Sequence, residues 1–230
     1  MPGSYGPHMS THRQAATAGF LAVALFAVGM LVSGTPPHPD ATVSELTRWM
    51  GEHRSGIVAG WLIGGAAIVP LLLLAAGLGE RLWPSERHRL LTTTMTACWL
   101  SLLTVFALSQ LPVVAVVWRG APFDTSLTRI AFDIWVIGAY AGTAVLAAAS
   151  IGLPCWIGLQ SGLLPRWLIV IGAAEVAANG IELTGVMATT GTNAAGFTWG
   201  LAPLLWTAWA AGASVALGRG TAGSTAPVQR

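Results

Sequence analysis

The chain has 230 residues, of which 54% are hydrophobic and only 9% are charged. Soluble domains carry about 25% charged residues, so this composition excludes an ordinary soluble protein and indicates a polytopic membrane protein. The net charge is +2 and no basic run occurs, which excludes a nucleic-acid-binding surface and leaves the lipid bilayer as the main expected partner. Cys98 and Cys155 lie in or near apolar segments without CxxC spacing, which predicts packing residues instead of a disulfide or a metal site.

Six segments reach the length of about 20 predominantly apolar residues that a membrane-spanning helix needs. They cover residues 15–34, 56–78, 91–118, 129–153, 165–187 and 196–217. The sequence therefore predicts an all-α fold, a six-helix transmembrane bundle over residues 15–217, with disordered tails at 1–14 and 218–230. Pro70, Pro112 and Pro203 are expected to kink the second, third and sixth spans.

The connection between the first two spans, residues 35–55, carries a helix signal of its own. The run TPPHPD favours extended chain, and Thr42 followed by Glu45 fits a capping box. Leu46, Trp49 and Met50 follow at helical spacing, so we expect a short external amphipathic helix. Such a helix is either an anchor in the membrane interface or a lid over a pocket.

Arginine placement predicts the orientation of the bundle. Seven of the eleven arginines fall on the side that holds both termini, and four fall on the other side. Because cytoplasmic loops are enriched in basic residues, both termini are expected in the cytoplasm.

Two short motifs resemble a known bacterial group. The stretch RSGI at residues 54–57 and the stretch SGLLPRWL at residues 161–168 are similar to motifs of the integral membrane proteins classed as domain of unknown function 4386. The resemblance implies a helical bundle in the bacterial cytoplasmic membrane and supplies no activity. Proline in a first helical turn and arginine at the inner interface also have a purely structural reason.

Three of the nine acidic residues, Asp133, Glu175 and Glu182, fall inside predicted spans. A charged side chain at the bilayer centre costs at least roughly 2.5–3.5 kcal/mol, so such residues mark functional sites by default. Glu175, Asn179 and Glu182 are spaced i, i+4, i+7 and share one helix face. Lipid cannot satisfy a polar stripe, and we therefore expect this face to meet protein or a substrate-filled cavity.

The depths of these acids follow from the helical rise of 1.5 Å per residue. Counted from Pro165, Glu175 lies about 15 Å deep and Glu182 about 26 Å deep, whereas Asp133 lies about 6 Å from the outer side. The sequence thus predicts that Asp133 and Glu182 share an outer level above Glu175. The alternatives are an ion pair of Asp133 with Arg129, an exposed Glu182 near the helix end, and a protonated Glu175 with a structural role only.

Eleven tryptophans accompany the acids. Six fall near predicted interfaces, as an aromatic belt requires. The deeper ones include Trp61, Trp135, Trp206 and Trp209, which we consider as substrate-binding residues together with Asn179. They serve either as packing residues or as a cage whose ring faces stabilise a positive charge.

Several kinds of chemistry are excluded by what the sequence lacks. None of the five histidines lies inside a predicted span, and the chain has no lysine. Histidine-ligated haem or metal within the membrane and a retinal Schiff base are therefore excluded. HExxH, GxSxG, P-loop and dinucleotide-binding motifs are absent as well, so we expect no metal and no cofactor.

Three classes of function remain. The leading prediction is a membrane-embedded isomerase or cyclase for a lipid-soluble, isoprenoid-like substrate, in which Asp133, Glu175 and Glu182 exchange protons and tryptophan faces stabilise a cation. Membrane cyclases of terpenoids offer an analogy of chemistry for it. The second is a proton-coupled carrier of small molecules or cations, with the same acids as a relay. The third is a scaffold or partner subunit whose polar stripe packs against another protein. Oligomerisation is possible, but glycine and alanine are too widely spread to indicate a helix–helix interface.

Overall fold

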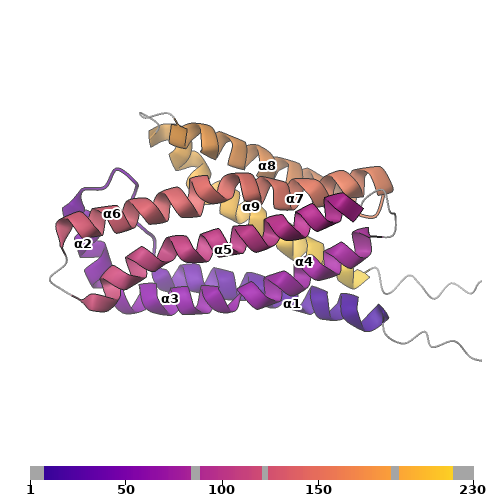
Figure 1. Cartoon of the computed structure of the whole chain (residues 1–230), viewed down its shortest axis with the longest axis horizontal. Helices are drawn as coiled ribbons and strands as arrows, with labels where there is room; N and C mark the ends of the chain where they lie inside the picture. Colours follow the sequence, from indigo (N-terminus) through magenta and orange to yellow (C-terminus); the bar gives the residue numbers. More distant parts are fainter. Residues whose placement is uncertain (1–7, 84–88, 121–123, 188–191, 220–230) are drawn as a thin grey trace, which may run out of the picture.

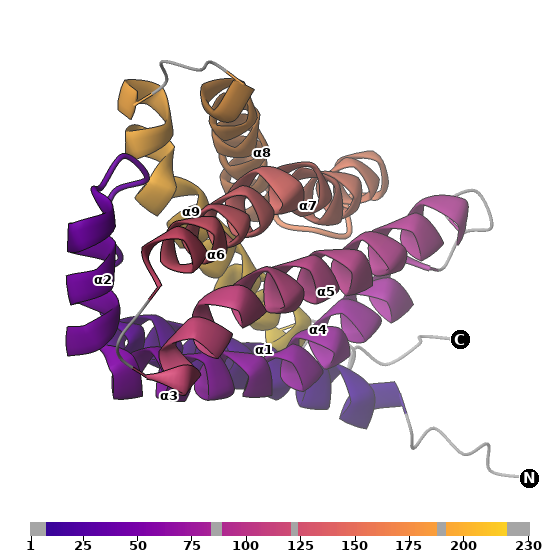
Figure 2. The same ribbon diagram turned by 60° about the vertical axis from the view of Figure 1, so that its left-hand side comes forward.

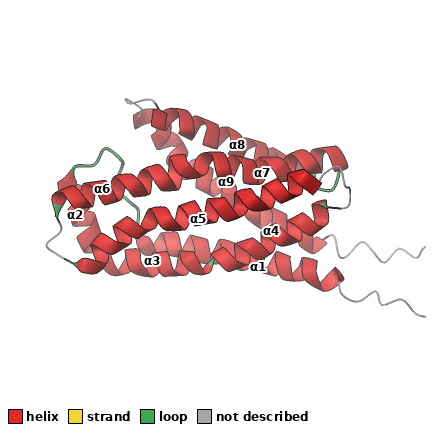
Figure 3. Ribbon diagram, viewed as in Figure 1, coloured by secondary structure: helices red, strands yellow, loops and turns green. Residues whose placement is uncertain are grey.

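The described part of the chain is built of helices alone (Figure 3). The computed structural model describes residues 8–83, 89–120, 124–187 and 192–219, and for residues 8–10, 185–187 and 192–199 it describes the backbone only. Six stretches are long and apolar enough to cross a membrane: Thr11–Ser33, Arg54–Leu82, Arg89–Arg119, Thr125–Ser161, Arg166–Thr184 and Gly200–Arg219. The prediction of an all-α bundle with six spans is confirmed.

The helices form one bundle, in which all but α2 run lengthwise beside one another (Figures 1 and 2). They are α1 (His8–Ser33), α2 (Val43–Glu52), α3 (Arg54–Ala66), α4 (Ile68–Leu82), α5 (Arg89–Arg119), α6 (Thr125–Val136), the π-helix η2 (Ile137–Ala141), α7 (Gly142–Ser161), α8 (Arg166–Met187) and α9 (Thr192–Arg219). The chain enters α1 and leaves α9 at one end of the bundle, the termini end, and α2 lies at the opposite end, the α2 end (Figures 1 and 2).

The first helix is longer than the sequence predicts. It begins at His8, so residues 8–14, expected in the disordered tail, are helical; residues 1–7 and 220–230 lie outside the described residues. The helix is supported there because Ala15 and Ala16 are buried, Ala15 directly against Gly77 of α4. Protein contacts at the termini end thus extend the ordered segment beyond the apolar stretch.

Pro70 interrupts the second span, as predicted. The span divides into α3 and α4 at Ala67, whose N–H donates to the Gly64 carbonyl over 3.1 Å. Proline has no N–H and its ring clashes with the carbonyl four residues earlier, which is that of Ala66. In contrast, α5 and α9 continue through Pro112 and Pro203.

The fourth span contains a π-helix that the sequence did not predict. Between α6 and α7, η2 contains one wider turn over Ile137–Ala141, and the Thr143 hydroxyl donates to the Ala139 carbonyl at 2.5 Å. Gly138 lies directly against the side chain of Ser109 on α5, where any larger residue would force the helices apart. Such π-turns are frequent at functional sites.

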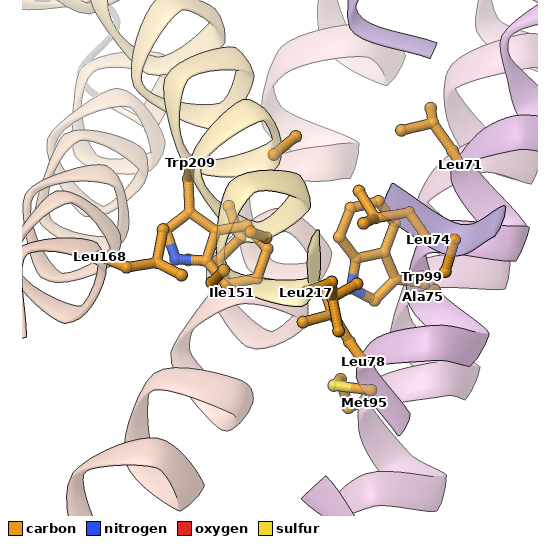
Figure 4. Packing of buried hydrophobic residues seen from close by; sticks show 14 of the residues in the cluster. Leu71, Leu74, Ala75, Leu78, Met95, Trp99, Ile151, Leu168, Trp209 and Leu217 are labelled. Carbon is orange, nitrogen blue, oxygen red and sulfur yellow. The ribbon is translucent and has the colours of Figure 1, made fainter. Parts of the chain in front are cut away.

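The main core lies between α1, α4, α5, α7, α8 and α9. Trp99 of α5 is fully buried among Leu74, Leu78 and Met95, and its indole N–H donates to the Ser150 carbonyl at 3.1 Å (Figure 4). Within lipid, helices associate through van der Waals packing and not through the exclusion of water. This densely packed core therefore fixes the positions of α4, α5 and α7 relative to one another.

The short external helix is present as predicted. The Thr42 N–H donates to Glu45 Oε2 at 2.7 Å and the Glu45 N–H donates to Thr42 Oγ1 at 3.4 Å, which is the predicted capping box. Leu46 and Met50 are fully buried, and with Trp49 they pack on a second core at the ends of α3, α5 and α6. Because its apolar face is turned to the bundle, α2 covers one end of the protein.

Candidate functional site

The predicted polar stripe of α8 is buried within the protein. Glu175, Asn179 and Glu182 expose 0%, 5% and 4% of their surface, and α8 packs between α7 and α9. The interpretation of Glu182 as an exposed acid near the helix end is therefore wrong. The stripe is also covered by the chain itself, which leaves it no face to offer to another protein.

Two carboxylate oxygens of this stripe lack a hydrogen-bond partner among the described residues. Asn179 Nδ2 donates to Glu175 Oε1 at 2.6 Å and to the Glu175 carbonyl at 3.0 Å. Glu175 Oε2 and Glu182 Oε1 are buried without such a bond. A buried polar atom left without a partner costs about 1–3 kcal/mol, and more when it is charged. The site therefore needs a proton, water or a ligand.

The stripe is closed on the side of the termini end, where three helices meet at Gly172. A Cβ atom at this position would lie 3.0 Å from Ile151 Cγ2 and 3.0 Å from Trp209 Nε1, and it would overlap Cys155 Sγ. Because Gly172 has no side chain, α8 can approach α7 and α9 closely at this residue. Glu175, one turn further on, therefore lies in the protein interior.

The side of the stripe toward the α2 end lies beside η2. This π-helix contacts α8, and its Tyr140 is a neighbour of Glu182. The ring of Tyr140 also lies edge-on to Trp135, with 6.4 Å between ring centroids. Glu175, Asn179 and Glu182 thus form one unit on a single face of α8, with the irregular helix η2 beside Glu182.

Asp133 does not belong to this unit. Arg129 Nε donates to Asp133 Oδ2 at 3.0 Å and Arg129 Nη2 lies 2.9 Å from Asp133 Oδ1, while Arg129 Nη1 donates to the Ala41 carbonyl at 3.1 Å. The alternative interpretation, an ion pair within α6, is confirmed. Both carboxylate oxygens of Asp133 bind Arg129, at a half-exposed position. Asp133 thereby orients Arg129, which holds the segment before α2 through the Ala41 carbonyl.

The four candidate tryptophans do not gather around the acids. Trp135 stacks on Trp49 of α2, with ring centroids 6.2 Å apart and planes 9° apart. Trp206 packs on Phe26 and Trp99 at centroid distances of 5.7 and 5.6 Å. Trp61 is half-buried in α3. Only Trp209 lies against the stripe, so the packing interpretation accounts for Trp135 and Trp206.

Reasoning from the sequence missed Cys155, Gly172 and Tyr140. Cys155 and Gly172 look like ordinary residues of apolar spans, and Tyr140 becomes a neighbour of Glu182 through a π-turn for which the sequence has no clear signal. Among the described residues no group of three His, Cys, Asp or Glu side chains is placed to hold a metal ion.

Comparison with family models, with curated proteins and with solved structures gives no match for this chain. The resemblance to domain of unknown function 4386 therefore stays a prediction.

Proposed function

We propose that this protein is a proton-coupled membrane carrier of small organic cations, in which Glu175 and Glu182 bind the proton and the cation in turn. One observation carries the proposal: two buried carboxyl groups lie on one face of α8, each with an oxygen that has no hydrogen-bond partner among the described residues. A buried carboxyl group without compensation is stable only in its neutral form. Release of the proton therefore requires a positive charge to replace it.

The arrangement along α8 supports stepwise transfer. Glu175 and Glu182 are seven residues apart, a rise of about 10.5 Å, so they occupy different depths of the membrane. Asn179 lies between them and occupies Glu175 Oε1 with its amide, which leaves Oε2 as the atom that takes the proton. With the orientation that the arginines predict, Glu182 is the outer site and Glu175 the central one.

The surroundings favour a carrier over a cyclase. A reaction through a carbocation needs several aromatic faces around the acid, and of the predicted set only Trp209 lies against the stripe. A carrier needs a wall that changes shape, and η2 beside Glu182 offers one. The predicted cyclisation of an isoprenoid stays a prediction.

The first experiment follows protonation directly. Infrared difference spectra of the protein in liposomes are recorded across a pH titration, because a protonated carboxylic acid absorbs apart from a carboxylate. We expect bands that Glu175→Gln and Glu182→Gln each remove, whereas Glu80→Gln, at an exposed acid of α4, leaves them unchanged. Spectra in which neither buried glutamate titrates would reject the proposal. A glutamic acid that keeps its proton throughout the pH range can have only a structural role.

The second experiment tests carriage. Liposomes with an internal pH dye receive tetraphenylphosphonium or ethidium, and proton efflux is recorded. We expect efflux that is abolished by Glu175→Gln and retained in Asp133→Asn. Efflux that is equal in the wild type and in Glu175→Gln contradicts the coupling.

A further inference from the structure

A groove at the α2 end is separate from the acid stripe. It has a volume of about 510 Å³ and lies between the end of α2, the N-terminal part of α3 and the end of α5. Its lining includes Glu52, Arg54, Val58, Ala59, Leu62 and Trp118. The second span begins at Arg54, so the upper part of the groove is at the membrane boundary and the remainder lies within the bilayer.

The upper part carries one positive and one negative group. Arg54 Nη2 donates to the Trp118 carbonyl at 3.0 Å, and the guanidinium lies on Gly120, where a Cβ would be 3.2 Å from Nη1. This contact fixes the guanidinium, and its other N–H groups have no hydrogen-bond partner among the described residues, so they can bind a ligand. The ion pairs found among the described residues are His38–Asp40 and Arg129–Asp133, so Arg54 and the exposed Glu52 are not paired with each other.

The lower part of the groove is apolar. Val58, Ala59 and Leu62 follow on α3, and Leu62 lies eight residues after Arg54, about 12 Å deeper. The side chains of Leu62 and Trp118 are 59% and 71% exposed, so the protein itself does not cover this surface. The groove thus has two opposite charges at one end and an apolar surface below them. A zwitterionic phospholipid has the matching arrangement, a headgroup with two opposite charges above apolar acyl chains.

We infer that this groove binds a phospholipid with a primary ammonium group, of the phosphatidylethanolamine type. The phosphate accepts hydrogen bonds from the free N–H groups of Arg54, the ammonium donates to the Glu52 carboxylate, and one acyl chain follows Val58 and Leu62. An anionic headgroup without an ammonium would meet Glu52 with like charge. The pair therefore selects a zwitterionic lipid over an anionic one.

The test is a competition between lipids with identical acyl chains. The full-length protein in detergent receives equimolar palmitoyl-oleoyl phosphatidylethanolamine, phosphatidylglycerol and phosphatidylcholine, and native mass spectrometry counts the lipids retained. We expect phosphatidylethanolamine to be retained about tenfold better than either competitor, the ratio that one charge-assisted hydrogen bond gives.

Three variants connect this preference to the groove. Arg54→Gln should lower retention of phosphatidylethanolamine about tenfold, and Glu52→Gln should abolish the preference over phosphatidylglycerol while phosphate binding remains. Arg119→Gln, at an exposed arginine of the same end outside the groove lining, should change neither. The Glu52 side chain is exposed and has no hydrogen bond to any described residue, so that variant folds even where Arg54→Gln does not. Equal retention of the three lipids by the wild type, or a preference unchanged in Glu52→Gln, overturns the inference.

Discussion

Replacement of Gly172 by alanine tests how the acid stripe is held. An added Cβ would overlap Cys155 Sγ and lie 3.0 Å from both Ile151 Cγ2 and Trp209 Nε1. Two neighbouring helices, α7 and α9, would have to move, and none of these three groups is the end of a long flexible side chain. The same substitution at Gly180, two turns further along α8, meets no atom within 4 Å.

The pair of variants separates packing from helix propensity. Alanine in place of glycine in a helix interior gains about 0.5–1 kcal/mol, and this gain is common to both positions. Overpacking of a dense interior costs about 1–3 kcal/mol, and only Gly172→Ala incurs it. We therefore expect Gly172→Ala to be about 1–3 kcal/mol less stable than Gly180→Ala, with Gly180→Ala at or above the wild type.

Reversible unfolding in mixed micelles, followed by circular dichroism, measures the two free energies of unfolding. The double variant Gly172→Ala with Cys155→Ala removes the nearest atom and should recover part of the loss. Equal stability of Gly172→Ala and Gly180→Ala would show that α8 does not approach α7 and α9 at this residue, and the burial of Glu175 would then need another cause.

Three further predictions concern α2 and α6. Thr42→Ala removes the cap of α2 and should destabilise this helix by about 0.5–2 kcal/mol, measured as faster amide exchange over residues 43–52 while α5 is unchanged. Hydrogen bonds from the Thr42 backbone N–H and, to a smaller extent, from its hydroxyl lower the pKa of Glu45 below its ordinary value of 4.5. The protection of α2 against exchange should therefore be complete above pH 4.5 and should fall as the pH drops through the lowered pKa. In Glu45→Gln the protection should not change over this pH range. Asp133→Asn breaks a half-exposed ion pair and should cost about 0–1 kcal/mol in the same unfolding assay, with the infrared bands of Glu175 and Glu182 intact.

Features that depend on a short stretch of sequence were predictable. The six spans follow from apolar length, and the capping box of α2 follows from Thr42 and Glu45 three residues apart. The pair of Arg129 and Asp133 is likewise local, at i and i+4, so it was among the alternatives considered. The burial of the polar stripe of α8 was also predictable, because lipid cannot form hydrogen bonds with a polar helix face.

Features that depend on the order of helices in space were not predictable. The sequence gives no register between α2 and α6, and so it did not indicate that Trp135 would stack on Trp49. The π-turn of η2 lies in a helix of ordinary composition, and it contains Tyr140, a neighbour of Glu182. Gly172 became important only when Cys155 and Trp209 were found beside it.

The two ends of the stripe differ in a way that predicts the path of the proton. At Gly172, α7, α8 and α9 are in close contact, whereas Glu182 lies beside η2, a π-turn of the kind that is frequent at functional sites. Protons should therefore reach Glu175 past Glu182, from the α2 end. In a pH jump followed by infrared spectroscopy, Glu182→Gln should slow the appearance of the Glu175 band, while Glu175→Gln should leave the rate of the Glu182 band unchanged. An unchanged rate for Glu175 in Glu182→Gln would mean that protons enter from the termini end, past a contact that leaves no room for a side chain.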